Sequence, residues 1–416
     1  MLVIGAGLSG LVAACQLAQA GLPTRLVAKG AGGLALSQGT IDLMGYPPAG
    51  AALANPFDFI SAPPPGHPYA AIGPANVRRG VQALLDLLGP DWMQGDLEAN
   101  AVLPTALGAL RPTALYPGSL AAGRPQAGAR WAVVGFDRVK DFSPALAAGN
   151  WNRAELPGGG RLHATPHLLE LPPSPVLGGL DASAMAVARA FDQPGFSQRV
   201  AEALRPAAKA ADAVALPAVL GAAGQGVWRE LGQELGKPVF EVGLPPPCLP
   251  GHRLAQTLTQ RARELGVRLV FGAAVTGFQA AGGRVVEVTA AAAGAPKRYP
   301  VDAIVYCPGG FESGAIALDS RYHLAETLFK LPLANLAPIE QLIGEEYGEA
   351  PAVFRVGVRV DAQMRPLDQG GEPVYQNLRV AGGLLGGAVR WAEKSGEGVA
   401  LGSAWAAVES VLRSVP

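Results

Sequence analysis

The first thirty residues change their hydrophobic pattern twice. Leu2–Ile4 is a short apolar run, which is typical of a buried strand. From residue 8 onward apolar residues recur at helical spacing, which predicts a helix over Leu11–Ala20 with Gly21 as its C-cap. A second apolar run, Thr24–Ala28, predicts another strand. The chain therefore begins with a strand, a helix and a strand.

Residues 51–244 show less regular alternation. They include two amphipathic segments, Val77–Leu88 and Ala182–Phe191, that predict helices. A Pro- and Gly-containing stretch over residues 103–113 interrupts the pattern between them. We interpret this block as a cap domain inserted into the domain that begins at residue 1.

The pattern of the first residues returns further along the chain. His252–Leu265 predicts a helix, and Ala303–Tyr306 predicts a strand that runs into Gly309 and Gly310. Between them we expect short strands separated by glycine turns, over residues 268–271, 275–279, 284–288 and 297–301. Near the C-terminus another predicted strand begins at Asn377 and runs into Gly382 and Gly383, and a predicted helix follows and extends through Leu412.

The predicted fold is therefore α/β: a Rossmann-like, three-layer domain with a small β-meander, plus an inserted α+β cap domain. Glycine-rich turns after the three strands of the first domain favour a flavin-binding domain. The expected division is residues 1–50, 245–315 and 373–416 for the flavin-binding domain, 51–244 for the cap and 316–372 for a return segment of the cap.

The turn between the first strand and the first helix carries a GxGxxG pattern. The first glycine permits a tight turn, the second leaves room for a pyrophosphate, and the third lets the helix pack closely on the strand. The start of the helix presents free backbone N–H groups and a positive dipole end to a phosphate. The candidate cofactor-binding residues of this turn are Gly5, Ala6, Gly7, Leu8, Ser9 and Gly10.

Three further glycine-containing segments are candidates for the same cofactor. A loop after the second strand occupies the place where flavoproteins of the fumarate reductase type wrap the flavin. The glycines after the two later strands are candidates for contacts with the same flavin, and the start of the last helix could stabilise negative charge at the isoalloxazine O2. The candidates are Gly33, Ser37, Gly39, Thr40, Gly309, Gly310, Gly382, Gly383, Gly398, Val399 and Ala400.

Composition excludes several classes of protein. Lysine and arginine together number 33, as do aspartate and glutamate, so the net charge is zero and a nucleic-acid binder is not indicated. No apolar stretch reaches the length of a membrane span, and we expect the N-terminal strand not to be a signal peptide, because no charged residues precede it. The three cysteines form no CxxC pair, so neither an iron–sulfur cluster nor a zinc site is indicated. We expect a cytoplasmic protein, with peripheral attachment to the inner face of the membrane through a partner subunit left open.

Several motifs are similar to those of one family. These are the N-terminal glycine turn, residues 37–43, 103–108 with 111–113, 133–136 with 141–142, 216–221, 244–247 through 253–254, 309–314 and the C-terminal glycines. On these residues, over nearly the whole chain, the sequence resembles the B subunit of the anaerobic glycerol-3-phosphate dehydrogenase. The cap-domain motifs are the more specific ones, because other flavoproteins share the glycine turns.

The resemblance implies a flavin-containing subunit that works with a larger, catalytic A subunit. It also implies a third, iron–sulfur subunit that anchors the pair to the membrane. The implied reaction is oxidation of sn-glycerol 3-phosphate to glycerone phosphate, with electrons passed to quinone. Two alternatives stay open: a stand-alone FAD-dependent oxidoreductase of the fumarate reductase type that acts on another small acid, and a non-catalytic electron-relay or structural subunit.

The identity of the flavin is also open at this stage. The resemblance implies FMN, and the position where dinucleotide-binding folds place a ribose-binding acid is occupied by Ala28. FMN has no adenosine and needs no such acid. The GxGxxG turn, however, normally holds a pyrophosphate, which favours FAD. The sequence leaves FMN and FAD as two candidates.

Oxidation of a secondary alcohol needs a base for the hydroxyl proton and cations for the substrate phosphate. His252 is the candidate base, because it stands at a helix start near the flavin domain; His163, His167 and His323 are weaker candidates. The candidate phosphate ligands are Arg111, Arg253 and Arg390, with Arg321 as a further one, because arginine binds phosphate oxygens in a bidentate manner.

Overall fold

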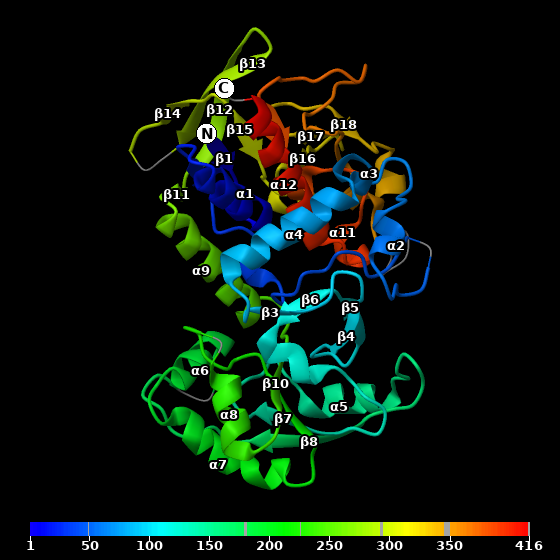
Figure 1. Ribbon diagram of the computed structural model, residues 1–416, viewed down its shortest axis with the longest axis vertical. Helices are drawn as coiled ribbons and strands as arrows, with labels where there is room; N and C mark the ends of the chain where they lie inside the picture. The colour runs from blue at the N-terminus through cyan, green and yellow to red at the C-terminus, as the bar shows by residue number, and fades with distance from the viewer. Residues whose placement is uncertain (49, 179–180, 225, 292–293, 345–349, 415–416) are drawn as a thin grey trace. The chain divides into compact units, whose positions relative to one another are not determined.

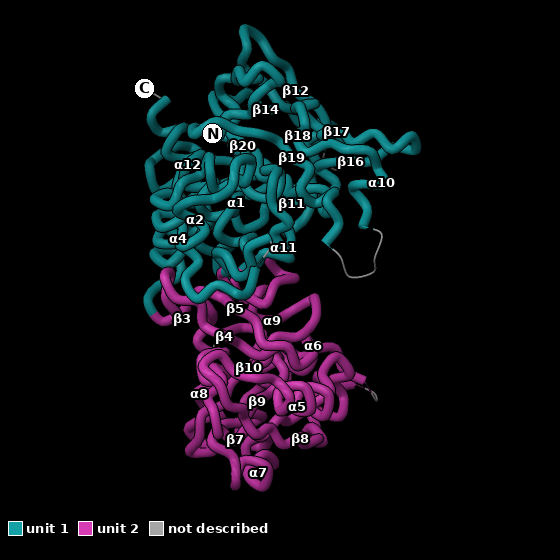
Figure 2. The backbone as a smooth tube through the Cα atoms, turned by 90° about the vertical axis from the view of Figure 1, so that its right-hand side faces the viewer, with its two compact units in different colours: residues 1–33, 42–90, 255–416 teal, residues 34–41, 91–254 magenta. Residues whose placement is uncertain are grey.

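The structure, a computed structural model, describes residues 1–416 except 49, 179–180, 225, 292–293, 345–349 and 415–416. Contacts between backbone positions divide the chain into two units (Figure 2). Unit 1 comprises Met1–Gly33, Asp42–Pro90 and Ala255–Pro416, and unit 2 comprises Leu34–Ile41 and Asp91–Leu254.

Unit 1 is built on a five-stranded parallel sheet with the order β11-β2-β1-β15-β20. In chain order this is the 3-2-1-4-5 arrangement of dinucleotide-binding folds. The strands of the sheet are β1 (Leu2–Ile4), β2 (Arg25–Ala28), β11 (Arg268–Phe271), β15 (Ile304–Tyr306) and β20 (Leu378–Val380).

Helices pack on this sheet, and short antiparallel strands complete the unit (Figure 1). The helices are α1 (Leu8–Gln19), α2 (Phe57–Ile60), α3 (Pro68–Ile72), α4 (Pro74–Leu88), α10 (Ile339–Leu342), α11 (Arg390–Glu393) and α12 (Gly396–Ser414), and α9 (Leu249–Glu264) runs from unit 2 into unit 1. The antiparallel strands are β12 (Ala274–Ala281), β13 (Arg284–Ala291), β14 (Lys297–Pro300), β16 (Ile316–Leu318), β17 (Leu324–Glu326), β18 (Leu333–Ala334) and β19 (Gly357–Val358).

The α/β class, the Rossmann-like sheet and the small meander are confirmed. The meander consists of β12, β13 and β14 in antiparallel order. β11 is not part of it, because this strand pairs with β2 and extends the parallel sheet. Helix α1 starts earlier than its apolar spacing predicts, at Leu8 rather than Leu11. Gly21 follows the C-cap in a left-handed conformation, at φ +79°.

Unit 2 has a parallel sheet of its own, with the order β10-β9-β7-β8. Its strands are β7 (Arg130–Phe136), β8 (His163–Leu169), β9 (Ala213–Pro217) and β10 (Val239–Val242), and its helices are α5 (Pro144–Arg153), α6 (Ala184–Phe191), α7 (Phe196–Ala208) and α8 (Val227–Leu235). Two antiparallel pairs accompany the sheet: β3 (Met93–Gly95) with β6 (Leu115–Pro117), and β4 (Ala101–Pro104) with β5 (Leu110–Thr113).

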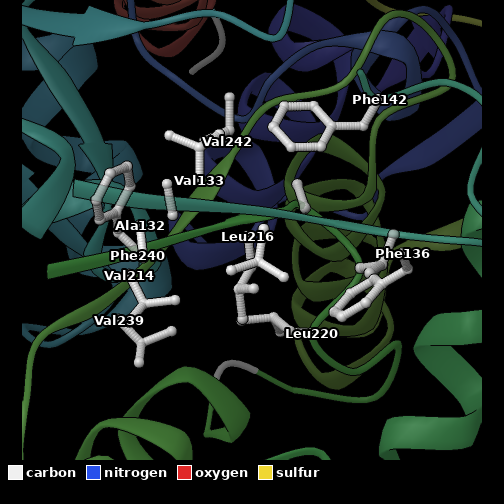
Figure 3. Close-up of a cluster of buried hydrophobic side chains, with 14 of the residues drawn as sticks. Ala132, Val133, Phe136, Phe142, Val214, Leu216, Leu220, Val239, Phe240 and Val242 are labelled. Carbon is white, nitrogen blue, oxygen red and sulfur yellow. The ribbon is translucent and has the colours of Figure 1, made fainter. Parts of the chain in front are cut away.

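The core of unit 2 lies on the parallel sheet (Figure 3). Trp131 packs edge to face on Trp151 at 5.7 Å and on Phe240 at 4.9 Å between ring centroids. The edge strand β8 is covered by the side chain of Asn152, whose amide exchanges two hydrogen bonds with the backbone of Ala164 at 2.6 and 2.9 Å. Asn152 thus takes the place of a neighbouring strand at that position.

The predicted division differs from this one in four segments. Residues 34–41 and 245–254, which we expected in the flavin-binding domain, have their contacts within unit 2. Residues 51–90 and 316–372, which we expected in the cap, have their contacts within unit 1. The reason for the first is that α4 packs on the last helix, α12, since Gly80 leaves space for the α12 backbone at Leu401. A pattern of apolar residues along α4 shows that the helix is amphipathic, but it does not show which surface covers its apolar face.

Arg253, a predicted phosphate ligand, has a structural role in unit 2. It is 4% exposed and forms a two-point ion pair with Glu241 of β10, at 2.7 and 3.0 Å. Its remaining donors bind the carbonyl oxygens of Leu220 and Gly221. Because its guanidinium is buried and engaged by the chain itself, the assignment of Arg253 as a phosphate ligand is corrected here.

We expect Arg253→Met to destabilise unit 2 by about 3–5 kcal/mol, because the Glu241 carboxylate would remain buried without its partner. The midpoint of urea unfolding, followed by tryptophan fluorescence, measures this effect. The matched control is Arg130→Met, which removes the solvent-exposed ion pair with Asp212 and should shift the midpoint far less, because water screens an exposed pair. Equal shifts for the two variants would contradict a structural role for the buried pair.

Candidate flavin-binding site

Three glycine turns of unit 1 meet at the carboxyl ends of its parallel strands. Gly5 follows β1 at φ +110° and lies so close to the carbonyl of Cys307, after β15, that a side chain at Gly5 would collide with it. Gly310 lies against the carbonyl oxygen of Gly383, after β20, which would be 2.6 Å from a Cβ at Gly310. The three turns therefore touch through backbone atoms, which only glycine permits at these positions.

The first of these turns also packs against its own helix and against the third turn. A Cβ at Gly10 would collide with the carbonyl oxygen of Gly5, so that α1 can approach β1 only with glycine at position 10. Gly382 lies over Ser9 in the first turn of α1, and its amide donates to Ser403 Oγ of α12 at 2.9 Å. Predicted site residues from three distant parts of the chain are thus brought together, as the carboxyl ends of neighbouring parallel strands require.

Gly7 differs from its neighbours in this turn. A Cβ at Gly7 would have no described atom of the protein within 4 Å, so the position faces open space. Gly7 is the N-cap of α1 and has no side-chain cap, and the first turn of α1 contains no acidic residue. The amides at the start of α1 and the positive end of its dipole are therefore not neutralised by an acid of that turn, which is the requirement for binding a pyrophosphate.

The loop after β2 closes against the same turn. Gly32, at φ +73°, lies on the amide nitrogen of Gly7, which would be 2.6 Å from a Cβ at Gly32. Gly33 follows it and would have nothing within 4 Å of a Cβ. At the end of β2 stands the buried Ala28, so the usual acid for the adenosine ribose is absent at this position. The residues present thus fit a pyrophosphate, whereas the ribose would need another partner.

Arg390 is the predicted phosphate ligand that lies on these turns. Its Nη2 atom would be 3.0 Å from a Cβ at Gly310 and 3.2 Å from one at Gly383, so the guanidinium rests on the backbone of both turns. Nη2 also donates to Glu312 Oε1 at 2.9 Å, and the Glu312 side chain is 51% exposed, whereas that of Arg390 is 14% exposed. A half-buried cation paired with an exposed acid is well placed to exchange that acid for an incoming anion.

The first turn of the last helix, α12, which we predicted to contact the flavin, has backbone amides that are hydrogen-bonded within the chain. Gly398 packs against Leu43 and Tyr69, and its amide donates to the Asp42 carbonyl at 3.1 Å. The amide of Val399 donates to Ser395. These two amides therefore have partners within the chain, while the roles of Gly398, Val399 and Ala400 toward a flavin stay predictions.

A buried network that the sequence pattern did not reveal holds this helix start. His67 Nδ1 accepts the amide of Tyr69 at 3.2 Å, so its Nε2–H is the donor to Glu393 Oε2 at 3.3 Å. Burial opposes the charge of Glu393, but hydrogen bonds from His67, Val389 and Ser395 hold the pKa of its carboxyl below the usual value. The only signal in the sequence was His67 directly before a proline, which is typical of a helix N-cap.

Tyr69 completes this network. Its hydroxyl donates to the carbonyl of Leu43 and lies 3.3 Å from that of Ser395. Burial, together with the nearby carboxylate of Glu393, raises the pKa of Tyr69 well above its usual value. Since all these groups are buried and engaged with one another, they position residues 43–45 and the start of α12, rather than serve as an acid or base.

The remaining predicted residues gather within unit 2. Arg111 on β5 donates to Gln38 Oε1 at 3.0 Å and to Thr40 Oγ1 at 2.7 Å, and so holds the loop that contains Ser37, Gly39 and Thr40. The same loop packs on the start of α9: Gly39 lies on Pro250, and the Ser37 carbonyl lies where a Cβ at Gly251 would be.

His252 is the next residue of α9. It is half-buried, and its ring makes no hydrogen bond with any residue that the structure describes. Its place beside the Ser37–Thr40 loop is compatible with a role as proton acceptor. This role stays a prediction.

Other candidate residues lie on β8 of unit 2 or are chemically inert. His163 and His167 lie on one face of β8 and, at about 3.3 Å per residue, roughly 13 Å apart. The three cysteines are buried and unpaired; burial raises the pKa of the Cys15 and Cys248 thiols to about 12 and that of Cys307 further. Among the described residues no helix combines the length and the apolar composition needed to cross a bilayer.

The order of the sheet, the uncapped start of α1 and the convergent glycine turns define a dinucleotide-type flavin-binding domain. In agreement with this, residues 1–399 match the FAD binding domain family, and the chain belongs to that family. Of the two flavins that the sequence left open, the family description gives FAD.

Curated relatives specify the family more closely. The chain is 35% identical to the probable B subunit of the anaerobic glycerol-3-phosphate dehydrogenase of Halobacterium salinarum, over 98% of this chain and 96% of that protein. It is 29% identical to the B subunit of the same enzyme of Vibrio vulnificus, over 99% and 95%, and 27% identical to that of Yersinia enterocolitica, over 100% and 98%. The chain belongs to the family of B subunits of the anaerobic glycerol-3-phosphate dehydrogenase, as the resemblance of its motifs indicated.

We expect Gly7→Val to abolish flavin binding without unfolding the protein, because the side chain would enter the space for the pyrophosphate and its Cβ would have no neighbouring described atom within 4 Å. The absorbance ratio of flavin to protein measures occupancy, and circular dichroism measures folding. Gly277→Val is the matched control, since a Cβ at this position of β12 also meets nothing within 4 Å; this variant should keep its flavin. Full occupancy in Gly7→Val would rule out the proposed cradle.

Gly10→Ala is expected to behave differently from Gly7→Val. Its Cβ would collide with the Gly5 carbonyl oxygen. Relief of this collision requires α1 to move away from β1, which disturbs the packing of the helix on the sheet. We therefore expect a fall in the thermal midpoint of the flavin-free protein, which calorimetry would detect. A flavin-free midpoint equal to that of the wild type would show that the close packing of α1 on β1 is not required.

Proposed function

We propose that this chain is the FAD-binding subunit of a quinone-linked, anaerobic glycerol-3-phosphate dehydrogenase. In this proposal it oxidises sn-glycerol 3-phosphate to glycerone phosphate together with a catalytic A subunit. An iron–sulfur subunit carries the electrons onward and attaches the complex to the cytoplasmic face of the membrane. The names of the relatives, each a B subunit, support a multi-subunit enzyme.

The observation that carries the proposal is the place of Arg390 on two of the glycine turns that form the flavin cradle. A substrate for hydride transfer must lie beside the flavin, and glycerol 3-phosphate brings a dianion that needs a cation there. Arg390 is held by its contact with the glycine backbone and faces an exposed acid, Glu312, that an incoming phosphate can replace. A guanidinium in this position suits a phosphorylated substrate better than an uncharged one.

A flavin held in this cradle would supply the hydride-accepting chemistry that oxidation of the carbinol carbon needs. The chain's own residues have three tasks. The amides at the start of α1 hold the pyrophosphate of FAD, and Arg390 holds the substrate phosphate. His252 is the proposed acceptor of the hydroxyl proton, and Arg111 orients the Ser37–Thr40 loop beside it through Gln38 and Thr40.

We expect Arg390→Ala to raise the KM for glycerol 3-phosphate about tenfold or more in the assembled complex. A charge-assisted hydrogen bond contributes about 1.5–3 kcal/mol, and about 1.4 kcal/mol corresponds to a factor of ten. Steady-state rates with an artificial electron acceptor measure the change. Arg263→Ala, which removes an exposed arginine of α9, is the control and should leave KM unchanged. The same KM in wild type and Arg390→Ala would remove Arg390 as the phosphate ligand.

The identity of the flavin and the need for the partner are tested with purified protein. Heat should release FAD, identified by chromatography, because the cradle is built for a pyrophosphate. The chain with its flavin should reduce no acceptor with glycerol 3-phosphate alone and should do so when the catalytic A subunit is added. Activity of the chain alone would favour a stand-alone oxidoreductase, and activity of the catalytic partner without this chain would favour a relay or structural role.

A further inference from the structure

A small pocket of unit 1 lies beside β20, at the edge of the parallel sheet. Its volume is about 210 Å³, the space of roughly seven waters. The walls come from four elements: α4, the loop before β20, β20 itself and the last helix, α12. Among the lining residues are Asn76, Gln363, Arg379, Glu409, Ser410 and Arg413. None of them belongs to the glycine turns.

Arg379 gives this pocket its chemistry. It is the central residue of β20 and is only 3% exposed. Its Nε donates to Ser410 Oγ at 2.8 Å, and its Nη1 donates to the carbonyl oxygens of Gln376 and Leu378. Within the described part of the chain, Nη2 has no hydrogen-bond partner and no carboxylate pairs with the guanidinium.

Such an arrangement is costly unless something else supplies the negative charge. A buried cation needs a partner charge, and the buried Arg253 of unit 2 has Glu241 for this purpose. The charged groups around Arg379 on balance disfavour the charge of its guanidinium further. Burial lowers its pKa to about 10, repulsion from Arg365 and Arg284 acts in the same direction, and only Asp361 opposes them.

The acids near the pocket are already engaged. Asp361 is paired with Arg365 at 2.7 Å, and Glu409 is paired with Arg413 at 3.1 Å. The hydroxyl of Ser410 accepts from Arg379, and its own hydrogen has no acceptor among the described residues. The walls therefore offer several hydrogen-bond donors from different directions and a net positive charge.

We propose that this pocket binds a phosphate group, either inorganic phosphate or the head of a small phosphate ester. A tetrahedral oxyanion can accept from the Arg379 guanidinium and from Ser410 at once, and so neutralise the buried charge. The volume leaves room for a few further atoms beyond the anion itself. The site is independent of the proposed dehydrogenase activity, because no residue of the flavin cradle contributes to it.

Because β20 leads into the Gly382–Gly383 turn, anion binding at Arg379 should stabilise the strand that carries this turn. The first measurement is the thermal midpoint of FAD-saturated protein, in which the glycine cradle is already filled. Sodium phosphate is compared with sodium chloride at equal ionic strength. We expect a rise of about 3–5 °C at phosphate concentrations ~100-fold above Kd. The absence of a phosphate-specific rise in the wild type would overturn the proposal.

Ser410→Asp is the decisive variant. Its carboxylate would stand beside Arg379 Nε and replace the bound anion. We therefore expect a higher midpoint without phosphate and no further response to phosphate. Ser320→Asp, in an exposed turn outside the pocket, is the control for charge and should respond like the wild type. A lower midpoint for Ser410→Asp, or a phosphate response as large as that of the wild type, would overturn the proposal.

Vesicles distinguish the two sources of the phosphate. Co-sedimentation with phosphatidylcholine vesicles that contain phosphatidic acid, lost in Ser410→Asp, would assign the site to a lipid headgroup. A phosphate response in solution without vesicle binding would assign it to a soluble phosphate compound. Either result supports the pocket as a phosphate site, and neither depends on dehydrogenase activity.

Discussion

Direct contact between backbone segments at the carboxyl edge of the parallel sheet is the constraint on which the site depends. Gly5 touches Cys307, Gly10 touches Gly5, and Gly310 touches Gly383. At these positions a single methyl group would collide with main-chain atoms of another segment. The strands β1, β15 and β20 can therefore end side by side, and their turns can leave a common surface to which backbone amides and one arginine contribute.

The two buried arginines show how the same residue type acquires different roles. Arg253 meets Glu241 in the interior of unit 2, so its charge is balanced and it joins the end of β9 to β10. Arg379 is equally buried but is bonded only to a hydroxyl and two carbonyls within the described residues. Arg390 is half-buried on glycine backbone, with an exposed acid as its partner. The degree of burial and the origin of the compensating charge, rather than the arginine itself, separate a structural residue from two candidate ligand-binding residues.

Unit 2 is more than an irregular insertion. Its parallel sheet, with the order β10-β9-β7-β8, has the crossover arrangement of a doubly wound fold, and it carries a large apolar core of its own. The loop of residues 34–41, which leaves β2 of unit 1, has its contacts within this second unit, where Arg111 and the start of α9 hold it. A segment that the sequence assigns to the flavin-binding domain thus depends for its conformation on residues much further along the chain.

The sequence by itself determined the class of fold, the glycine fingerprint and the family, because these depend on local features: apolar periodicity, glycine spacing and motifs of a few residues. It also indicated the parallel strands, the meander and the longer helices of the flavin-binding unit. Tertiary structure alone decided which arginine is buried against an acid, that α4 belongs with α12, that β11 joins the parallel sheet, and that His67, Tyr69 and Glu393 form one network. The physical reason is the same in each case. Burial, charge compensation and close approach depend on residues far apart in the chain, and a linear pattern does not record which of them meet.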